Sequence, residues 1–370
     1  MNTLVYILVG MLLLLTLHGW CAAIGFSVVL LRARREEVRR DELPRTAILM
    51  GLKGSDPDLL DGLQRLMRLD YPDYELHIVV DSETDPAWPV VHEAIAAAEA
   101  DHVHVETYAP SAATGPVNST NSKQMQLLQK LDDSFEVVAM ADGDLIAHPD
   151  WLRDLVAPLL RDDKVAATFG NRWFMPEESH MGSLVRYTWG VAAAISMCFL
   201  SMPWGGCFAI KMSVVRKLNL IEKWSQFIAF DAATPGDLKR AGLRLRFIPH
   251  LMMPNYEECR LGFCHNFFQR QLTWTRLYHP GWRLVSGYAF FAGATQLGST
   301  VAAVVAAAVG EYQLAAWLAG AVALNALGHP ITDGHLTWRT NNRRSNAPAA
   351  ETAVSATFIE PSRSRPIVAC

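Results

Sequence analysis

The sequence predicts an α/β fold in which a mostly parallel sheet is preceded by one membrane helix and followed by a membrane helical hairpin. Three observations support this fold class. Short β-rich segments alternate with helical patterns between Thr46 and His250, which is typical of a parallel sheet with covering helices. Long apolar segments lie at both ends of this region, as in membrane proteins with a soluble middle. An Asp-Gly-Asp turn, residues 142–144, follows one of the predicted strands.

The first apolar segment runs from Leu4 to Leu31 and contains no Asp, Glu, Lys or Arg. It is longer than the roughly 20 residues needed to cross a bilayer, and it lacks the basic start of a signal peptide. Five arginines follow it closely: Arg32, Arg34, Arg35, Arg39 and Arg40. By the positive-inside rule, residues 1–31 are therefore predicted to be a transmembrane anchor, with the chain after them in the cytoplasm.

Residues 32–283 form the predicted cytoplasmic domain. Its strands are expected at Thr46–Leu52, Leu76–Val80, His102–Glu106, Glu136–Met140 and Val165–Phe169. Its helices are expected at Asp58–Arg68, Pro89–Ala100, Asn121–Leu131 and Asp150–Leu160. A further apolar stretch, Val191–Ile210, contains Pro203 and two adjacent glycines. We expect an interfacial helix there that leads into a strand.

Two apolar segments follow, Leu284–Gly310 and Leu314–Leu327, separated by a short polar break. They predict a hairpin over residues 284–328 that returns the chain to the cytoplasm, in agreement with the arginines that come after it. Because the second segment is short, a re-entrant or interfacial helix is an alternative. The composition of residues 329–370, with many Ala, Ser and Pro, predicts a disordered tail.

Composition and motifs exclude several classes of protein. The formal net charge of −4, with 19% charged residues, provides no basic excess to neutralise phosphates, so nucleic acid is not an expected partner. The six cysteines are scattered, and Cys259 with Cys264-His265 lacks the second half of a zinc motif. The absence of GxGxxG and GxxxxGK[ST] segments argues against dinucleotide oxidoreductases and P-loop NTPases.

Three carboxylates follow predicted strands: Asp81 after the second, and Asp142 and Asp144 after the fourth. Because open α/β sheets bind ligands at the carboxyl ends of strands, we expect these side chains to share a ligand. Two carboxylates around a glycine suit Mg²⁺ or Mn²⁺ bound together with diphosphate oxygens. The alternative for each acid is a structural turn or helix cap.

A metal at this turn would offset the charge that develops on a departing diphosphate. Because the chain has no glycine-rich phosphate loop, a bound metal is the expected means of binding the diphosphate. The combination therefore indicates glycosyl or nucleotidyl transfer.

Several short motifs occur along the domain in a fixed order. They are Gly51-Leu52-Lys53-Gly54-Ser55-Asp56-Pro57, Leu69-Asp70-Tyr71-Pro72, Asn121-Ser122-Lys123, Ala141-Asp142-Gly143-Asp144 and Trp204-Gly205-Gly206-Cys207. In order and spacing across residues 44–283 they resemble the processive-type inverting glycosyltransferases of the glycosyltransferase-A fold. Within that group the resemblance is to the ceramide glucosyltransferases.

The resemblance implies a role for each matched residue. Asp81 would contact the uracil or ribose of UDP, Lys123 would lie near the diphosphate, and Asp142 with Asp144 would support metal binding. Asp231 matches the general base, which accepts the proton of the acceptor's primary hydroxyl as that oxygen attacks the anomeric carbon with inversion. From the residues alone, Asp231 suits a helix N-cap.

Two positions depart from the family pattern. The family places an acid directly before the base, where this chain has Phe230. The closing signature, (Gln/Arg)-x-x-Arg-Trp, has Thr273 in place of the arginine that supports the diphosphate or the acceptor site. Arg270 or Arg276 is then a candidate substitute. Trp274 is a candidate for stacking against a ligand, with an interfacial tryptophan as the alternative.

We therefore expect a membrane hexosyltransferase that moves glucose from UDP-glucose to the primary hydroxyl of ceramide or a similar lipid. The expected cofactor is Mg²⁺ or Mn²⁺, and the expected nucleotide-sugar site comprises Asp81, Lys123, Asp142, Arg270 and Trp274. The membrane would be a bacterial inner membrane or a eukaryotic endomembrane. The alternatives are a polysaccharide synthase, which would need more membrane helices for its channel, and a catalytically silent binding protein. The oligomeric state is not assigned.

Overall fold

The computed structural model describes residues 2–109, 119–176, 178 and 180–325. The chain divides into two compact units. Among the described residues, the helix unit comprises residues 2–32 and 281–325, and the sheet unit comprises residues between 33 and 280.

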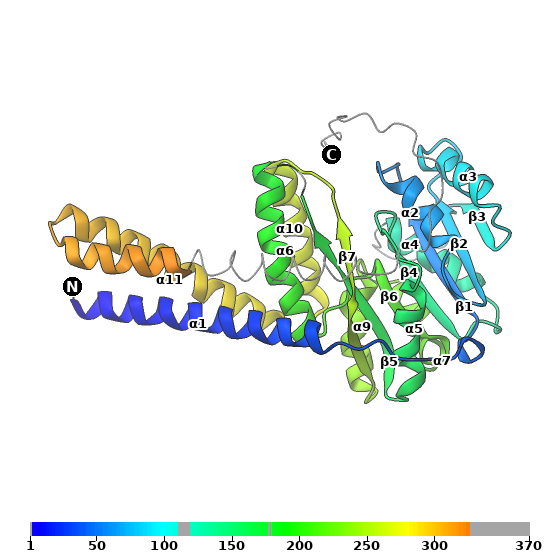
Figure 1. Ribbon diagram of the computed structural model, residues 1–370, viewed down its shortest axis with the longest axis horizontal. Helices are drawn as coiled ribbons and strands as arrows, with labels where there is room; N and C mark the ends of the chain where they lie inside the picture. The colour runs from blue at the N-terminus through cyan, green and yellow to red at the C-terminus, as the bar shows by residue number, and fades with distance from the viewer. Residues whose placement is uncertain (1, 110–118, 177, 179, 326–370) are drawn as a thin grey trace. The chain divides into compact units, whose positions relative to one another are not determined.

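The sheet unit is built on a seven-stranded sheet with the order β3-β2-β1-β4-β6-β5-β7 (Figure 1). The strands are β1 (Thr46–Leu52), β2 (Tyr74–Val80), β3 (Val103–Thr107), β4 (Val137–Ala141), β5 (Val165–Phe174), β6 (Cys207–Lys211) and β7 (Arg244–Asn255). Strands β3, β2, β1 and β4 run parallel to one another, as do β5 and β7, whereas β6 is antiparallel to both neighbours. The prediction of a mostly parallel α/β sheet is confirmed.

Helices cover both faces of this sheet. Ile48 and Met50 of β1 belong to one buried cluster and Ala47 and Leu49 to another, because successive side chains of a strand point to opposite faces. The first cluster includes residues of α2 (Leu59–Leu66), α3 (Ala87–Ala98) and α5 (Trp151–Arg161). The second includes residues of α4 (Ser119–Lys130), α7 (Met212–Lys217), α8 (Leu220–Trp224) and α9 (Phe230–Arg240). The domain thus has three layers, and a short 3-10 helix, η1 (Arg40–Glu42), precedes β1.

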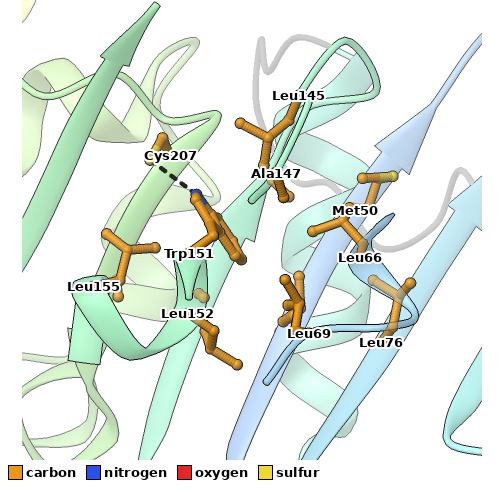
Figure 2. Packing of buried hydrophobic residues seen from close by; sticks show 14 of the residues in the cluster. Met50, Leu66, Leu69, Leu76, Leu145, Ala147, Trp151, Leu152, Leu155 and Cys207 are labelled. Atoms are coloured by element: carbon orange, nitrogen blue, oxygen red, sulfur yellow. Dashed lines mark hydrogen bonds between the residues drawn. The ribbon is translucent and has the colours of Figure 1, made fainter. Parts of the chain in front are cut away.

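Trp151, at the start of α5, packs with Leu152 and Leu155 in the first cluster (Figure 2). Its indole Nε1 donates a hydrogen bond to Cys207 Sγ at 3.2 Å, so the buried N–H has a partner. Burial raises the pKa of the Cys207 thiol to about 12, which keeps the sulfur protonated. This contact fixes the beginning of β6, and with it the glycines that precede β6 beside the carboxyl end of β4.

Two further helices, α6 (Met181–Leu200) and α10 (Leu261–Tyr278), pack side by side, and α6 also packs on β5 (Figure 1). The predicted helix-to-strand segment is present, but α6 begins ten residues earlier than expected, and it ends at Leu200. Pro203 lies in the turn before β6, in agreement with the low tolerance of helix interiors for proline. By length and apolar composition α6 is capable of crossing a membrane.

In the helix unit, α1 (Asn2–Arg32) and α11 (Trp282–Ala308) pack against each other. Gly310 adopts a left-handed φ of +84°, and residues 312–325 form a second helical segment. A small cluster of Val5, Ala306, Leu314 and Leu318 holds these segments together. The end of the predicted hairpin and the predicted disordered tail lie outside the described residues.

Both α1 and α11 are long and apolar enough to cross a membrane. Many of their large apolar side chains are exposed, among them Leu4, Leu14, Phe290 and Leu297. Exposed apolar surface of this extent is unusual in water and suits contact with lipid. Together with α6, these helices indicate membrane association.

Asp154 of α5 makes the stability of the sheet unit depend on pH. Its side chain is 4% exposed, and burial raises the pKa of Asp154 to about 7, although Arg35 Nε lies 3.3 Å from its Oδ2. The folded state then binds more protons than the unfolded state between the ordinary carboxyl pKa and about 7. Stability therefore falls as the pH rises through that window.

We expect Asp154→Asn to remove most of this decline. At about pH 8 the variant should be more stable than wild type by about 2–4 kcal/mol, and at about pH 4 the two should be similar. Thermal unfolding at both pH values measures the difference. A variant whose melting temperature declines as steeply as that of wild type would assign the pH dependence to other groups.

Candidate active site

A cavity of about 510 Å³ lies beside the acidic turn that follows β4, at the edge where open α/β sheets bind ligands. Four carboxylates line it: Asp56, Asp142, Asp144 and Asp231. Its other lining residues include apolar side chains of α6 and side chains of α10. The cavity therefore combines an acidic region with an apolar one.

The Asp142-Gly143-Asp144 turn follows β4 directly and faces Arg172 of β5. Arg172 Nη2 lies 3.3 Å from Asp142 Oδ2 and 2.9 Å from Asp144 Oδ1. Trp204 Nε1 donates to Asp142 Oδ2 at 3.0 Å, and Asn255 Nδ2 donates to Asp144 Oδ2 at 2.9 Å. The two carboxylates therefore converge on one cationic nitrogen.

This acid pair fits a divalent cation. The side chains of Asp142 and Asp144 are only 29% and 23% exposed. Burial and the neighbouring Asp144 raise the pKa of Asp142 to about 6, against the opposing effects of Arg172 and Trp204. The two carboxylates carry more negative charge than the single Arg172 guanidinium compensates. Their oxygens are hard ligands of the kind that Mg²⁺ or Mn²⁺ prefers.

Arg172 and Asn255 were not predicted as site residues. Strand β5 was expected to end at Phe169, but it continues past an irregularity in register between Phe169 and Asn171. A Cβ at Gly170 would lie 2.4 Å from the Leu251 carbonyl oxygen, so glycine permits the close approach of β7 there. A bulge of this kind redirects a strand, and here the strand beyond it carries Arg172 to the acid pair. Gly170 within an apolar strand was the available signal.

The segment Trp204-Gly205-Gly206 connects the acid pair with Asp231. Gly205 N donates to Asp231 Oδ2 at 2.8 Å, while Trp204 binds Asp142 as described above. A Cβ at Gly206 would lie 2.4 Å from Asp142 Oδ2. Glycine at this position is therefore required for the segment to pass so close to the acidic turn.

Asp231 lies in the first turn of α9, whose N-cap is Ala229, so Asp231 does not occupy the N-cap position that its local sequence suggested. Its Oδ1 accepts a hydrogen bond from Ala232 N at 2.8 Å. Burial raises the pKa of Asp231, and the hydrogen bonds from Gly205 and Ala232 oppose this rise. A carboxylate with a raised pKa is a stronger base near neutral pH.

Phe230, which stands where the family has an acid, is 4% exposed. Its ring packs against Trp224 and Phe208, with centroids 5.0 and 5.8 Å away. This position therefore belongs to the second buried cluster, where an unpaired carboxylate would be costly.

Asp81 ends β2, as predicted, and forms a close pair with Lys123 of α4. The Lys123 Nζ lies 2.8 Å from Asp81 Oδ1, and the Lys123 side chain is 1% exposed. Lys53 Nζ lies 3.3 Å from the other oxygen, and the Lys123 hydrogen bond is the main cause that lowers the pKa of Asp81. Lys53 lines the cavity, whereas Asp81 and Lys123 are outside its lining.

Arg270 and Trp274 of α10 both line the cavity. The guanidinium carbon of Arg270 lies 5.5 Å from the centre of the Trp274 ring, within the range of a cation–π contact. Thr273 and Arg276 are exposed residues outside the cavity lining. Of the two candidate substitutes for the signature arginine, the structure therefore brings Arg270 to the site.

The three-layer domain, with an acidic turn at the carboxyl edge of its sheet, has a fold of the glycosyltransferase-A type. The sequence matches the model of Glycosyl transferase family 21 over residues 11–359. The chain belongs to this family and is a glycosyltransferase.

Comparison with solved structures gives several matches. The mannosyltransferase PcManGT from Pyrobaculum calidifontis, in complex with GDP-Man and Mn²⁺, matches with a TM-score of 0.58 and 17% identity, over 93% of this chain and 100% of that chain. S. aureus TarS 1–349 matches with a TM-score of 0.40 and 12% identity, over 57% of this chain and 60% of that chain. M. tuberculosis glucosyl-3-phosphoglycerate synthase, in complex with Mn²⁺, UDP and glucosyl-3-phosphoglycerate, matches with a TM-score of 0.39 and 15% identity. The match covers 58% of this chain and 76% of that chain. The likeness to the first of these supports the shared fold.

Proposed function

We propose that the protein transfers glucose from UDP-glucose to the primary hydroxyl of ceramide or a similar lipid, with inversion at the anomeric carbon. The observation that carries this proposal is that the Asp142–Asp144 pair and Asp231 line one cavity and are joined through residues 204–206. Transfer requires stabilisation of a leaving diphosphate and deprotonation of an attacking hydroxyl in one space.

The acid pair is the proposed donor end of the site. Asp142 and Asp144 would hold Mg²⁺ or Mn²⁺, which supplies positive charge to the departing diphosphate. The structurally similar mannosyltransferase is in complex with a nucleotide-sugar and Mn²⁺, in agreement with this assignment. Asp81, oriented by Lys123, would contact the nucleoside, and Arg270 would meet the diphosphate beside Trp274.

Asp231 is the proposed base. Its carboxylate would take the proton of the acceptor hydroxyl while that oxygen forms a bond to the anomeric carbon. The bond from that carbon to the diphosphate breaks in the same step, and UDP leaves with the electron pair. Gly205 N and Ala232 N hold the Asp231 carboxylate in one orientation during this step.

The apolar part of the cavity is the proposed acceptor end. Trp189, Ala193 and Met197 line it from α6, and α6 also exposes Met181 and Phe199 to the surroundings. A helix that is apolar on both its cavity side and its outer side supports an acceptor that arrives from the lipid phase.

The arginines that follow α1 support a cytoplasmic location for the catalytic domain. In this proposal residues 1–31 are the anchor, residues 32–283 form the catalytic domain, and residues 284–328 form the membrane hairpin. The membrane is then both the anchor surface and the source of the acceptor.

The proposal is tested with the purified full-length protein in detergent micelles that contain ceramide. Radiolabelled UDP-glucose, UDP-galactose and GDP-mannose are supplied separately, with and without EDTA. We expect label in the lipid extract with UDP-glucose, lost in EDTA and restored by Mg²⁺ or Mn²⁺. A water-soluble polymer would indicate a synthase instead, and no product with any donor or lipid would support a silent binding protein.

Arg270 provides a further prediction. If it replaces the signature arginine, Arg270→Ala should raise the KM for the sugar donor by about 10–100-fold, the usual effect of losing a hydrogen bond to a charged group. Arg276→Ala, on the exposed side of the same helix, is the matched control and should behave as wild type. Equal effects of the two substitutions would remove Arg270 from the donor site.

A further inference from the structure

A cluster of Glu75, His77 and His104 lies on the sheet far from the catalytic cavity. One potential ligand atom from each of the three side chains lies within 4.8 Å of the other two. Glu75 and His77 are two residues apart on β2 and therefore point to the same face. His104 is the register partner of His77 on the neighbouring strand β3, which is the edge strand of the sheet (Figure 1). The backbone pairing thus brings the three side chains together.

The distances from the two histidine nitrogens to the Glu75 carboxylate are those of ligand atoms around a small cation. His77 Nε2 lies 3.1 Å and His104 Nε2 lies 3.0 Å from the same oxygen, Glu75 Oε2. Tetrahedral zinc holds its ligand atoms roughly 3.3 Å apart, because each lies about 2.0–2.1 Å from the ion. The two imidazole rings are stacked, with centroids 4.8 Å apart, so both nitrogens lie beside the carboxylate.

His77 Nε2 is buried and makes no hydrogen bond among the described residues, although Glu75 Oε2 is 3.1 Å away. The two atoms therefore lie within contact distance without a hydrogen bond of good geometry. An ion between the two atoms would satisfy both.

Residues around the cluster orient it as the outer shell of a metal site does. The Arg45 guanidinium donates to Glu75 Oε1, which leaves Oε2 directed at the histidines. Phe135 packs edge-on against the His77 ring at 5.8 Å and covers one side of the cluster. Ligating carboxylates and imidazoles in metalloproteins are commonly held by such partners.

We propose that Glu75, His77 and His104 form a zinc site that is separate from the catalytic centre and clips the edge strand β3 to β2. Two imidazoles and one carboxylate are an established ligand set for Zn²⁺, with a water in the fourth position. His104 is 55% exposed, so the ion has a route from solvent. His77, the ligand of β2 nearest the carboxyl edge of the sheet, lies four residues before Asp81, so about 13 Å of strand separates the clip from that edge.

The experiment uses the full-length protein, stripped with EDTA and titrated with Zn²⁺ against a chromogenic zinc chelator. Wild type should bind one tight Zn²⁺, and His104→Ala should weaken this binding by about 100-fold or more. His92→Ala, a change at an exposed histidine of α3, should retain it. The double variant Asp142→Asn/Asp144→Asn should also retain it, which distinguishes the clip from the catalytic centre.

Because His104 is largely exposed, His104→Ala should fold, and His77→Ala provides a second ligand variant. Zn²⁺ should raise the melting temperature of wild type and leave that of His104→Ala unchanged. Retention of the tight site in both histidine variants would overturn the proposal. So would a wild-type protein whose only tight Zn²⁺ disappears with Asp142 and Asp144.

Discussion

Replacing Asp231 with asparagine should lower the rate of sugar transfer by about 10²–10⁴-fold, the range expected when a general base is removed. Asparagine has nearly the same shape as aspartate but cannot accept the proton of the acceptor hydroxyl. The affinity for UDP should stay close to that of wild type, because residues 204–206 lie between Asp231 and the acid pair. The measurement combines initial transfer rates with calorimetric titration of UDP.

The control for this substitution is Asp237→Asn, which makes the same chemical change on α9. Asp237 pairs with Lys223 and Arg240 and is absent from the cavity lining. It should therefore retain most of the transfer rate. If Asp231→Asn transferred sugar as fast as Asp237→Asn, the base would have to be another group.

Replacing Asp144 with asparagine should lower the transfer rate by about 10²–10³-fold, the effect typical of removing one stabiliser of transition-state charge. Part of the loss should be recovered at high metal concentration, because the metal would retain Asp142. Asp163→Asn, at an exposed position after α5, is the matched surface control. A rate that is independent of metal in both wild type and Asp144→Asn would contradict the assigned metal site.

The acid pair also predicts how activity depends on pH. Because the pKa of Asp142 is raised to about 6, lowering the pH through 6 protonates this carboxylate, which is a proposed metal ligand. Activity should therefore fall on the acidic side with an apparent pKa near 6 at low metal concentration. A higher metal concentration should shift this acidic fall in activity to lower pH, since metal and proton compete for the same oxygens.

The positions of most strands along the chain and the acidic edge of the sheet could be predicted because they depend on local patterns. Apolar runs such as that of β4 identify buried strands, and the Asp142-Gly143-Asp144 turn directly follows that run. Once the strands are taken as parallel, their carboxyl ends must lie at one edge. Asp81 also directly follows its strand as predicted, and it pairs with Lys123 outside the cavity lining.

The contacts that complete the site depend on pairings between distant segments. Arg172 reaches the acid pair only because β5 continues beyond Gly170 and pairs with β7 up to Asn255. Similarly, the cluster of Glu75, His77 and His104 depends on the register between β2 and β3. No local sequence pattern specifies such a register. The exposure of Thr273 and the placement of Arg270 follow from the rotation of α10, which the apolar pattern of that helix left undetermined.

In the proposed reaction a single displacement takes place in this cavity, with Asp231 as the base and the diphosphate leaving from the acid pair. The most direct test is the anomeric configuration of the lipid product, measured by NMR after transfer from α-linked UDP-glucose. We expect a β-glycoside, because one displacement inverts the anomeric carbon. An α-glycoside would contradict it.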